Sequence, residues 1–86
     1  MKIKEGFVLR ETAGSYIVMN LGSEISFNGV ITLNETGAFI WKAIEDGKSE
    51  GDIAKAIAEE YEVDYESALS DASNFIAKMS KAGILE

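Results

Sequence analysis

The sequence predicts an α+β fold, in which a three-stranded antiparallel β-meander is followed by a three-helix bundle. Segments rich in β-branched and aromatic residues come before residue 34, and capped segments with helical periodicity come after it. Strands and helices do not alternate, so a parallel sheet is not expected. No internal repeat or linker interrupts the 86 residues, of which 47% are hydrophobic, and this suits one domain over residues 1–86.

The first two strands are predicted at Phe7–Thr12 and Ser15–Asn20. They are separated by Ala13 and Gly14 only, and glycine readily takes the positive φ that a two-residue hairpin turn needs. The two strands should therefore pair antiparallel.

The third predicted strand, Gly29–Leu33, follows a loop over Leu21–Asn28 in which Ile25 and Phe27 point inward. In a meander the first and third strands form the edges of the sheet, and soluble proteins usually guard such edges with charges, proline or a bulge. The first strand has such guards, namely Lys4, Glu5, Arg10 and Glu11. The third has neither charge nor proline, so its edge is predicted to be open for pairing with another chain.

Each of the three predicted helices begins at a residue whose side chain can accept a hydrogen bond from a free main-chain N–H. These N-caps are Asn34, Ser49 and Asp64, and glycines at 47 and 83 are expected to end the first and third helices. The second helix has one apolar stripe, formed by Ile53, Ala54, Ile57, Ala58 and Tyr61. The third has its apolar residues on one side, namely Ala68, Leu69, Ala72, Phe75, Ile76 and Met79.

The net charge of −7 comes from one part of the chain. Residues 45–66 contain nine acidic residues and only two basic ones, Lys48 and Lys55, whereas acids and bases balance in the rest. This region is interpreted as a solvated surface that keeps the protein in solution, with a docking patch for a basic protein as the alternative. Absence of cysteine and of any apolar run longer than four residues predicts a cytoplasmic protein without a membrane anchor.

The residue types of most catalytic sites are missing. Without histidine or cysteine the chain cannot form a Ser-His-Asp or Cys-His arrangement, and no Gly-rich phosphate loop is present. The acidic residues lack the spacing and the turn glycine of a calcium loop. No catalytic residue, metal site or cofactor is therefore predicted, and function should depend on a surface that binds.

Several segments together resemble the PqqD family, the small proteins of pyrroloquinoline quinone (PQQ) biosynthesis and their relatives, which are also called the RiPP recognition element. These segments are VITLNETGAFIW, DGKS, DIAKAIAEEYEVD and ALSDASNFIAKMSKAGIL, and they extend over about residues 5–85. Members dedicated to pyrroloquinoline quinone tend to have a serine-alanine pair where this chain has Thr36 and Gly37. The resemblance therefore leaves open whether the precursor belongs to that pathway or to another.

The resemblance implies a non-catalytic peptide chaperone. Such domains bind the leader of a ribosomally synthesised precursor peptide and present it to a modifying enzyme, often a radical S-adenosylmethionine (SAM) protein. In the family the leader adds as an antiparallel strand beside the third strand, in a groove closed by the third helix. The implied positions are Gly29, Val30, Ile31, Thr32 and Leu33 on the strand and Leu69, Ala72, Ser73, Ile76 and Met79 on the helix.

Two other functions remain open from the sequence. The open strand could pair with itself in a structural or oligomerising module, so both a monomer and a homodimer are possible. Three helices on a small meander are also the plan of winged-helix DNA-binding proteins. Nucleic-acid binding is disfavoured because affinity for DNA comes mainly from Lys and Arg, whereas the second helix has four acids against Lys55.

Overall fold

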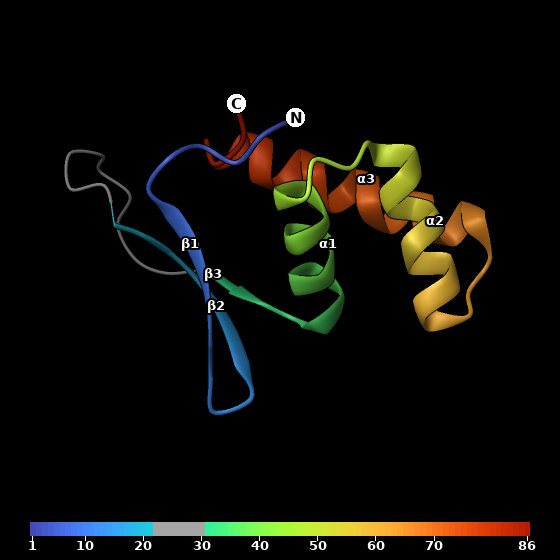
Figure 1. Ribbon diagram of the computed structural model, residues 1–86, viewed down its shortest axis with the longest axis horizontal. Helices are drawn as coiled ribbons and strands as arrows, with labels where there is room; N and C mark the ends of the chain where they lie inside the picture. Colours follow the sequence, from blue (N-terminus) through green and yellow to red (C-terminus); the bar gives the residue numbers. More distant parts are fainter. Residues whose placement is uncertain (22–30) are drawn as a thin grey trace.

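The structure is a computed structural model that describes residues 1–21 and 31–86. Within these ranges β2 lies between β1 and β3, and both strand pairs are antiparallel. The three helices follow the sheet in sequence, so the predicted α+β fold class is confirmed (Figure 1). The elements are β1 (Phe7–Thr12), β2 (Ser15–Asn20), β3 (Ile31–Leu33), α1 (Glu35–Glu45), α2 (Glu50–Tyr61) and α3 (Tyr65–Lys81).

The β1–β2 hairpin has the predicted bounds and the predicted two-residue connection. Ala13 has φ 48° and Gly14 has φ 81°. Positive φ at both central residues is the requirement of a type I′ turn, whose twist matches that of the flanking strands. The turn sets the register, in which Thr12 lies opposite Ser15.

The described part of the third strand is shorter than the predicted one. It begins at Ile31 and ends at Leu33, where Leu33 lies opposite Tyr16 and Ile31 opposite Val18. Gly29 and Val30, which the prediction includes, lie outside the described residues, as do residues 22–28 of the predicted loop with Ile25 and Phe27.

The predicted N-caps are confirmed in all three helices. The side chains of Asn34, Ser49 and Asp64 accept hydrogen bonds from the main-chain N–H groups of Gly37, Asp52 and Ser67, at 2.7, 3.2 and 3.2 Å. These bonds satisfy donors that a helix start leaves without a partner inside the helix.

Gly47 and Gly83 follow the caps of α1 and α3, with φ of 83° and 79°. After α3, Gly83 N–H donates to Ser80 O at 3.0 Å and Ile84 N–H to Met79 O at 3.0 Å, which is the Schellman pattern. α2 ends differently, because its cap Glu62 itself has the left-handed conformation, with φ 53°.

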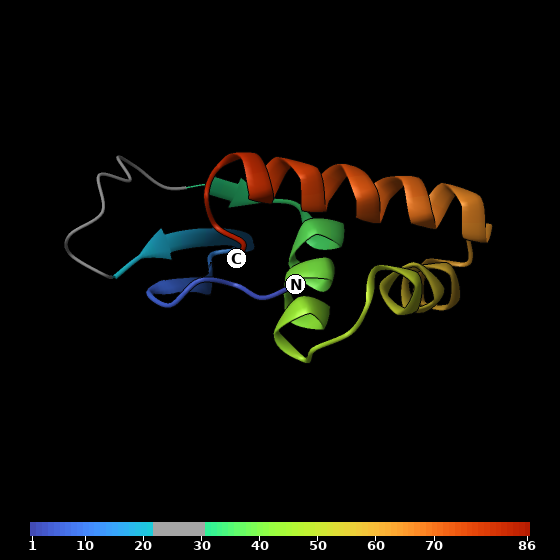
Figure 2. The same cartoon turned by 90° about the horizontal axis from the view of Figure 1, so that it is seen from above.

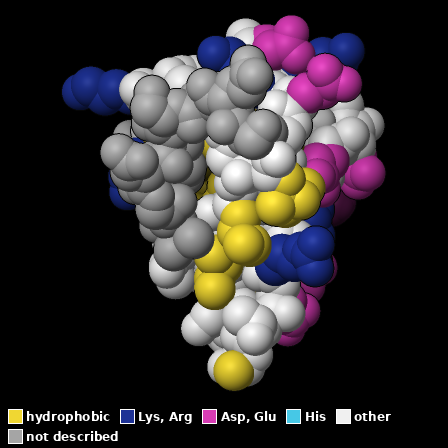
Figure 3. Space-filling view, turned by 90° about the vertical axis from the view of Figure 1, so that its left-hand side faces the viewer, with side chains coloured by type: hydrophobic (Ala, Val, Ile, Leu, Met, Phe, Trp, Pro, Cys, Tyr) yellow, Lys and Arg dark blue, Asp and Glu magenta, His cyan; other side chains and the backbone are white. Residues whose placement is uncertain are grey.

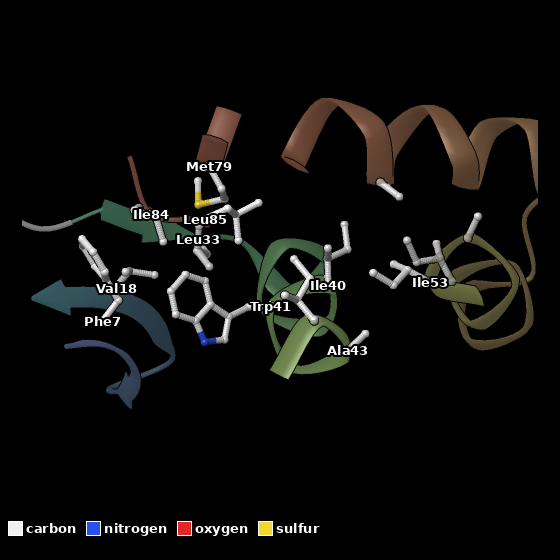
Figure 4. Packing of buried hydrophobic residues seen from close by; sticks show 14 of the residues in the cluster. Phe7, Val18, Leu33, Ile40, Trp41, Ala43, Ile53, Met79, Ile84 and Leu85 are labelled. Atoms are coloured by element: carbon white, nitrogen blue, oxygen red, sulfur yellow. The ribbon is translucent and has the colours of Figure 1, made fainter. Parts of the chain in front are cut away.

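The hydrophobic core lies between the sheet and the three helices (Figure 4). Trp41 of α1 is completely buried between the residues of the sheet and those of α3, and it is the only tryptophan of the chain. At the other end of the core, Ile53 and Ile57 of α2 are buried with Ala68 and Ala72 of α3. All three helices therefore contribute to one packed cluster.

The two ends of the described chain pair with each other, which the sequence did not predict (Figure 1). Ile3 and Leu85 form an antiparallel bridge, Lys4 N–H donates to Ile84 O at 2.8 Å, and Glu86 N–H donates to Lys2 O at 2.8 Å. Ile84 and Leu85 are buried there.

The third helix extends from α2 to β3 (Figure 2). Figure 2 shows that α3 runs in the direction opposite to β3, with its C-terminal end beside that strand and its N-terminal half over α2.

Among the helices of residues 1–21 and 31–86, none combines the length and the apolar character needed to cross a membrane.

Candidate functional site

The free edge of β3 presents main-chain groups of Thr32. In a hairpin closed by a two-residue turn, the flanking residues Thr12 and Ser15 bond to each other, and the direction of the main-chain groups then alternates along β2. Consistent with this alternation, Leu21 N–H donates to Gly6 O at 2.7 Å, on the β1 side. Tyr16 and Val18 therefore face β3.

The same alternation applies to β3. Its residues Leu33 and Ile31, opposite Tyr16 and Val18, direct their main-chain groups to β2. Thr32 lies between them, so its N–H and C=O point away from the sheet. Within the described residues no strand lies beyond β3. The Thr32 main chain is thus a donor and an acceptor at an open edge.

A groove separates this edge from α3. Its volume is about 360 Å³, and it is bounded by β3, by the first turns of α1 and by one side of α3. The α3 residues recur at helical spacing and so form one stripe, which consists of Asp71, Asn74, Phe75, Lys78 and Met79. We call this set the α3 stripe. From β3 and α1 the groove is lined by Ile31, Thr32, Leu33, Asn34, Thr36, Gly37 and Ile40.

The floor of the groove is apolar and closely packed. Leu33 and Met79 are buried, and Phe75 is half-buried against the core. Gly37 permits this packing, because a Cβ at that position would be 3.2 Å from Phe75 Cε1 and 3.3 Å from Leu33 Cβ. Figure 4 shows Leu33 and Met79 close together at the sheet side of the core.

Charged side chains stand at the rim of the floor. Asp71 and Lys78 are the charged residues among those that line the groove, and both are exposed. Neither forms an ion pair with another residue of the described chain. Exposed hydrophobic side chains also form a narrow strip on the sheet end of the molecule, beside Lys or Arg side chains (Figure 3).

The structure brings together some of the predicted peptide-binding residues and separates others. Ile31, Thr32, Leu33 and Met79 line the groove. Gly29 and Val30 lie outside the described residues. Four predicted residues of α3 do not line it, namely Leu69, Ala72, Ser73 and Ile76.

Each of these four has a different neighbourhood. Ala72 is fully buried in the core, and Leu69 packs against the core. Ser73 Oγ donates to Glu50 Oε2 of α2 at 2.8 Å. Ile76 lines a second hollow, of about 550 Å³, between α3, the connection at residues 47–50 and the chain ends. Their peptide-binding role remains a prediction that the groove geometry does not support.

Sequence reasoning missed Asp71, Asn74, Phe75 and Lys78 as groove residues, although the signal was present. Starting from Met79, the residue one turn earlier is Phe75, and the next step reaches Asp71. Lys78 and Asn74 are their neighbours on the same side. The family resemblance instead implied Leu69, Ala72, Ser73 and Ile76, which belong to the side of α3 that packs against the core or contacts α2.

A metal centre is not evident in the part of the chain that the structure describes. Over residues 1–21 and 31–86, no three acidic side chains come close enough together to hold an ion. The whole sequence has no histidine or cysteine. What the groove offers is a main-chain donor and acceptor, an apolar floor and two charges of opposite sign.

The chain is similar to known proteins in sequence and in fold. The family model described as coenzyme PQQ synthesis protein D (PqqD) matches residues 8–85. Among solved structures, TbiB1 in complex with the TbiA(beta) leader peptide is similar, with 27% identity, a TM-score of 0.83 and coverage of 100% of this chain and 95% of that one.

A lasso peptide synthetase B1 complexed with the leader peptide has the same fold, with 22% identity, a TM-score of 0.82 and coverage of 99% of this chain and 95% of that one. No curated protein matches the sequence significantly. The family model extends over nearly the whole chain and confirms the resemblance seen in the sequence. The chain is therefore a member of the PqqD family.

Proposed function

We propose that this protein is a non-catalytic peptide chaperone of the cytoplasm, formed by a single domain over residues 1–86. It binds the leader of a ribosomally synthesised precursor peptide as an additional strand on β3. It then presents the precursor to a modifying enzyme, of the radical SAM type or another peptide-modifying class. Membership of the PqqD family and the likeness to TbiB1, which was solved with a leader peptide, support this function.

The observation that carries the proposal is the outward direction of the Thr32 main chain beside the α3 stripe. Strand addition takes affinity from main-chain hydrogen bonds and specificity from pockets for alternate side chains. The edge of β3 supplies the first, and the groove of about 360 Å³ supplies the second. Charged residues do not block this edge, because Ile31, Thr32 and Leu33 are uncharged.

Magnitudes indicate that the apolar floor is necessary. Each main-chain hydrogen bond contributes about 0.5–1.5 kcal/mol net, whereas ordering a peptide residue costs about 1–2 kcal/mol. Hydrogen bonds at a short edge cannot offset that cost alone. A guest side chain buried over Phe75 and Met79 contributes roughly 1.5–3 kcal/mol, so two or three such anchors give an affinity near micromolar, about −8 kcal/mol.

A proline at position 32 provides the direct test. Thr32→Pro removes the outward N–H but no bond to β2, and proline is tolerated on edge strands. Thr32→Val is the matched control, because it keeps the N–H and changes only the exposed hydroxyl. Peptides enriched on the wild-type protein from a display library of random sequences are then titrated by calorimetry against all three proteins.

We expect Thr32→Pro to weaken binding about tenfold or more and Thr32→Val to leave it nearly unchanged, since one hydrogen bond and the close approach of the guest are lost together. The position matters, because Ile31→Pro would instead remove a bond to β2 and leave the outward N–H of Thr32 in place. Equal affinity for folded Thr32→Pro and wild type would exclude strand addition at β3.

A self-paired homodimer is the competing use of the same edge. Light scattering with and without an enriched peptide separates the two, because a guest strand must displace a second copy from β3. A stable dimer whose mass does not change when peptide is present would favour the oligomerising module.

For the enzyme partner, co-purification with a modifying enzyme encoded near the gene is the test, and a complex that forms without any precursor peptide would show a role beyond presentation.

A further inference from the structure

The groove is asymmetric in charge along its length. Asp71 and Lys78 both line it, and they lie seven residues apart on α3, which corresponds to about 10 Å along the helix axis. Figure 2 shows the C-terminal end of α3 beside β3 and its middle over α1. Lys78 is the nearer of the two to that C-terminal end, so it lies toward β3, and Asp71 lies toward the first turns of α1. An extended guest would meet the two charges one after the other.

The order in which a guest meets them depends on its direction. A strand antiparallel to β3 runs parallel to α3, so its N-terminal part passes Asp71 and its C-terminal part passes Lys78. A strand advances about 3.3 Å per residue, and side chains on one face recur every second residue. The separation of about 10 Å therefore corresponds to guest positions two or four residues apart on the face directed at α3.

We propose that the groove selects peptides by charge order, with a basic residue four positions before an acidic residue and an apolar residue midway between them on the same face, because at a spacing of two the intervening side chain would point away from α3. The basic side chain pairs with Asp71, the apolar one covers Phe75 and Met79, and the acidic one pairs with Lys78. This inference rests on the proposed strand addition and names the class of leader that the site accepts.

A structural role alone does not account for the two charges. Lys78 and Lys81 are both in the last turn of α3, where either one complements the helix dipole, but only Lys78 lines the groove. Asp71 is in the middle of α3, beyond the first turn where an acidic residue would stabilise the helix. Neither residue is in an ion pair with any other residue of the described chain, so both are available to a guest.

The experiment compares the peptides that different variants select. Wild type, the charge-swapped double variant Asp71→Lys/Lys78→Asp and Thr32→Pro are each used to enrich peptides from the same random display library. The matched control is Lys55→Glu/Glu59→Lys, which exchanges two exposed charges on α2 without changing the net charge. Emission of buried Trp41 verifies that each variant is folded.

We expect wild type and the α2 control to enrich basic-before-acidic peptides and the swapped variant to enrich the reverse order. Resynthesised peptides of the two orders should differ in affinity for wild type by about three- to tenfold, as expected for exposed ion pairs gained and lost. This ratio should shrink in high salt, because exposed charges are screened.

Three outcomes would overturn the inference in different ways. Wild type could enrich peptides without a charge order that Thr32→Pro does not enrich. That result would refute the proposed charge order and leave strand addition intact. A preference for acidic-before-basic peptides would mean that the guest runs parallel to β3. If wild type enriches no peptide above the Thr32→Pro background, both the proposed function and the proposed charge order are contradicted.

Discussion

The ring of Phe75 on α3 packs against the backbone of Gly37 on α1. A side chain at residue 37 would not fit there unless its neighbours moved. A Cβ at Gly37 would be 3.2 Å from Phe75 Cε1 and 3.2 Å from the Asn34 side-chain oxygen that caps α1. The absence of a side chain at residue 37 thus helps to determine the shape of the groove floor. Gly37 is one of the two positions at which the sequence departs from the serine-alanine pair expected of members dedicated to pyrroloquinoline quinone, so this departure lies at the groove.

Gly37→Ala should change binding more than stability. Alanine favours the helix by roughly 0.5–1 kcal/mol relative to glycine, but the new methyl group must displace Phe75 by a few tenths of an ångström. We expect the free energy of unfolding to change by less than about 1 kcal/mol and the affinity for an enriched peptide to fall about three- to tenfold. Calorimetric titration and denaturant unfolding measure the two quantities.

Gly51→Ala is the control for this variant, because Gly51 is also helical and its added Cβ would meet only the Tyr65 hydroxyl, at an ordinary 3.6 Å. It should stabilise the protein without altering peptide affinity. If both glycine variants affect binding equally, the contact between Gly37 and Phe75 does not shape the groove.

Adjacent residues of α3 should separate binding from stability. Phe75 and Ile76 are both half-buried against the core, but Phe75 lines the groove and Ile76 lines the hollow on the other side. Replacement of either by alanine should cost about 1.5–3 kcal/mol of unfolding free energy, somewhat less than for a fully buried residue. Phe75→Ala should also weaken peptide binding about tenfold, whereas Ile76→Ala should not.

The stability measurement uses Trp41, which is fully buried and does not line the groove. Its emission therefore reports unfolding and not peptide contact. Loss of peptide affinity in folded Ile76→Ala, but not in Phe75→Ala, would support the implied peptide-binding role of Ile76. It would contradict peptide binding in the groove that Phe75 lines.

The N-cap of α3 should make stability depend on pH. Hydrogen bonds from the Ser67 side chain and main-chain N–H lower the pKa of Asp64 from its ordinary value of 3.8. A carboxyl whose pKa is lowered in the folded state stabilises that state fully above its unfolded pKa, and the contribution disappears as pH falls through the folded pKa. Wild type should therefore melt at a higher temperature than Asp64→Asn at pH 7.

This difference should remain constant down to about pH 5 and then diminish below the ordinary aspartate value of 3.8. Asparagine is a good N-cap but carries no charge, so the comparison isolates the ionised form. Thermal unfolding at a series of pH values measures it. A difference in melting temperature that persists in strong acid would show that ionisation of Asp64 is not the cause.

Much of the fold could be predicted because its signals are local. The two-residue turn at Ala13 and Gly14 and the caps at Asn34, Ser49 and Asp64 depend on residues within a few positions of each other, and all were predicted with their structural roles. The pairing of Ile3 with Leu85 was missed, because no local pattern indicates that two distant ends will meet.

The candidate site was predicted only in part, because only its local signals are visible in the sequence. The absence of charge on β3 is visible in the sequence, whereas the side of α3 that faces β3 is not. The family resemblance implied Leu69, Ala72 and Ile76, yet α3 has several neighbours, and its residues are distributed among α1, α2, β3 and the chain ends. Sequence periodicity identifies the residues that become buried but not the element against which each is buried.

By itself, the amino-acid sequence determined the order of strands and helices, their caps and the lack of histidine and cysteine, since these follow from residue types and short-range spacing. Only the tertiary structure decided that Thr32 directs its main chain outward and that Asp71, Phe75 and Lys78 line the same groove as Thr32. The physical reason is that strand register and the rotation of a helix about its axis are set by contacts between segments far apart in the chain.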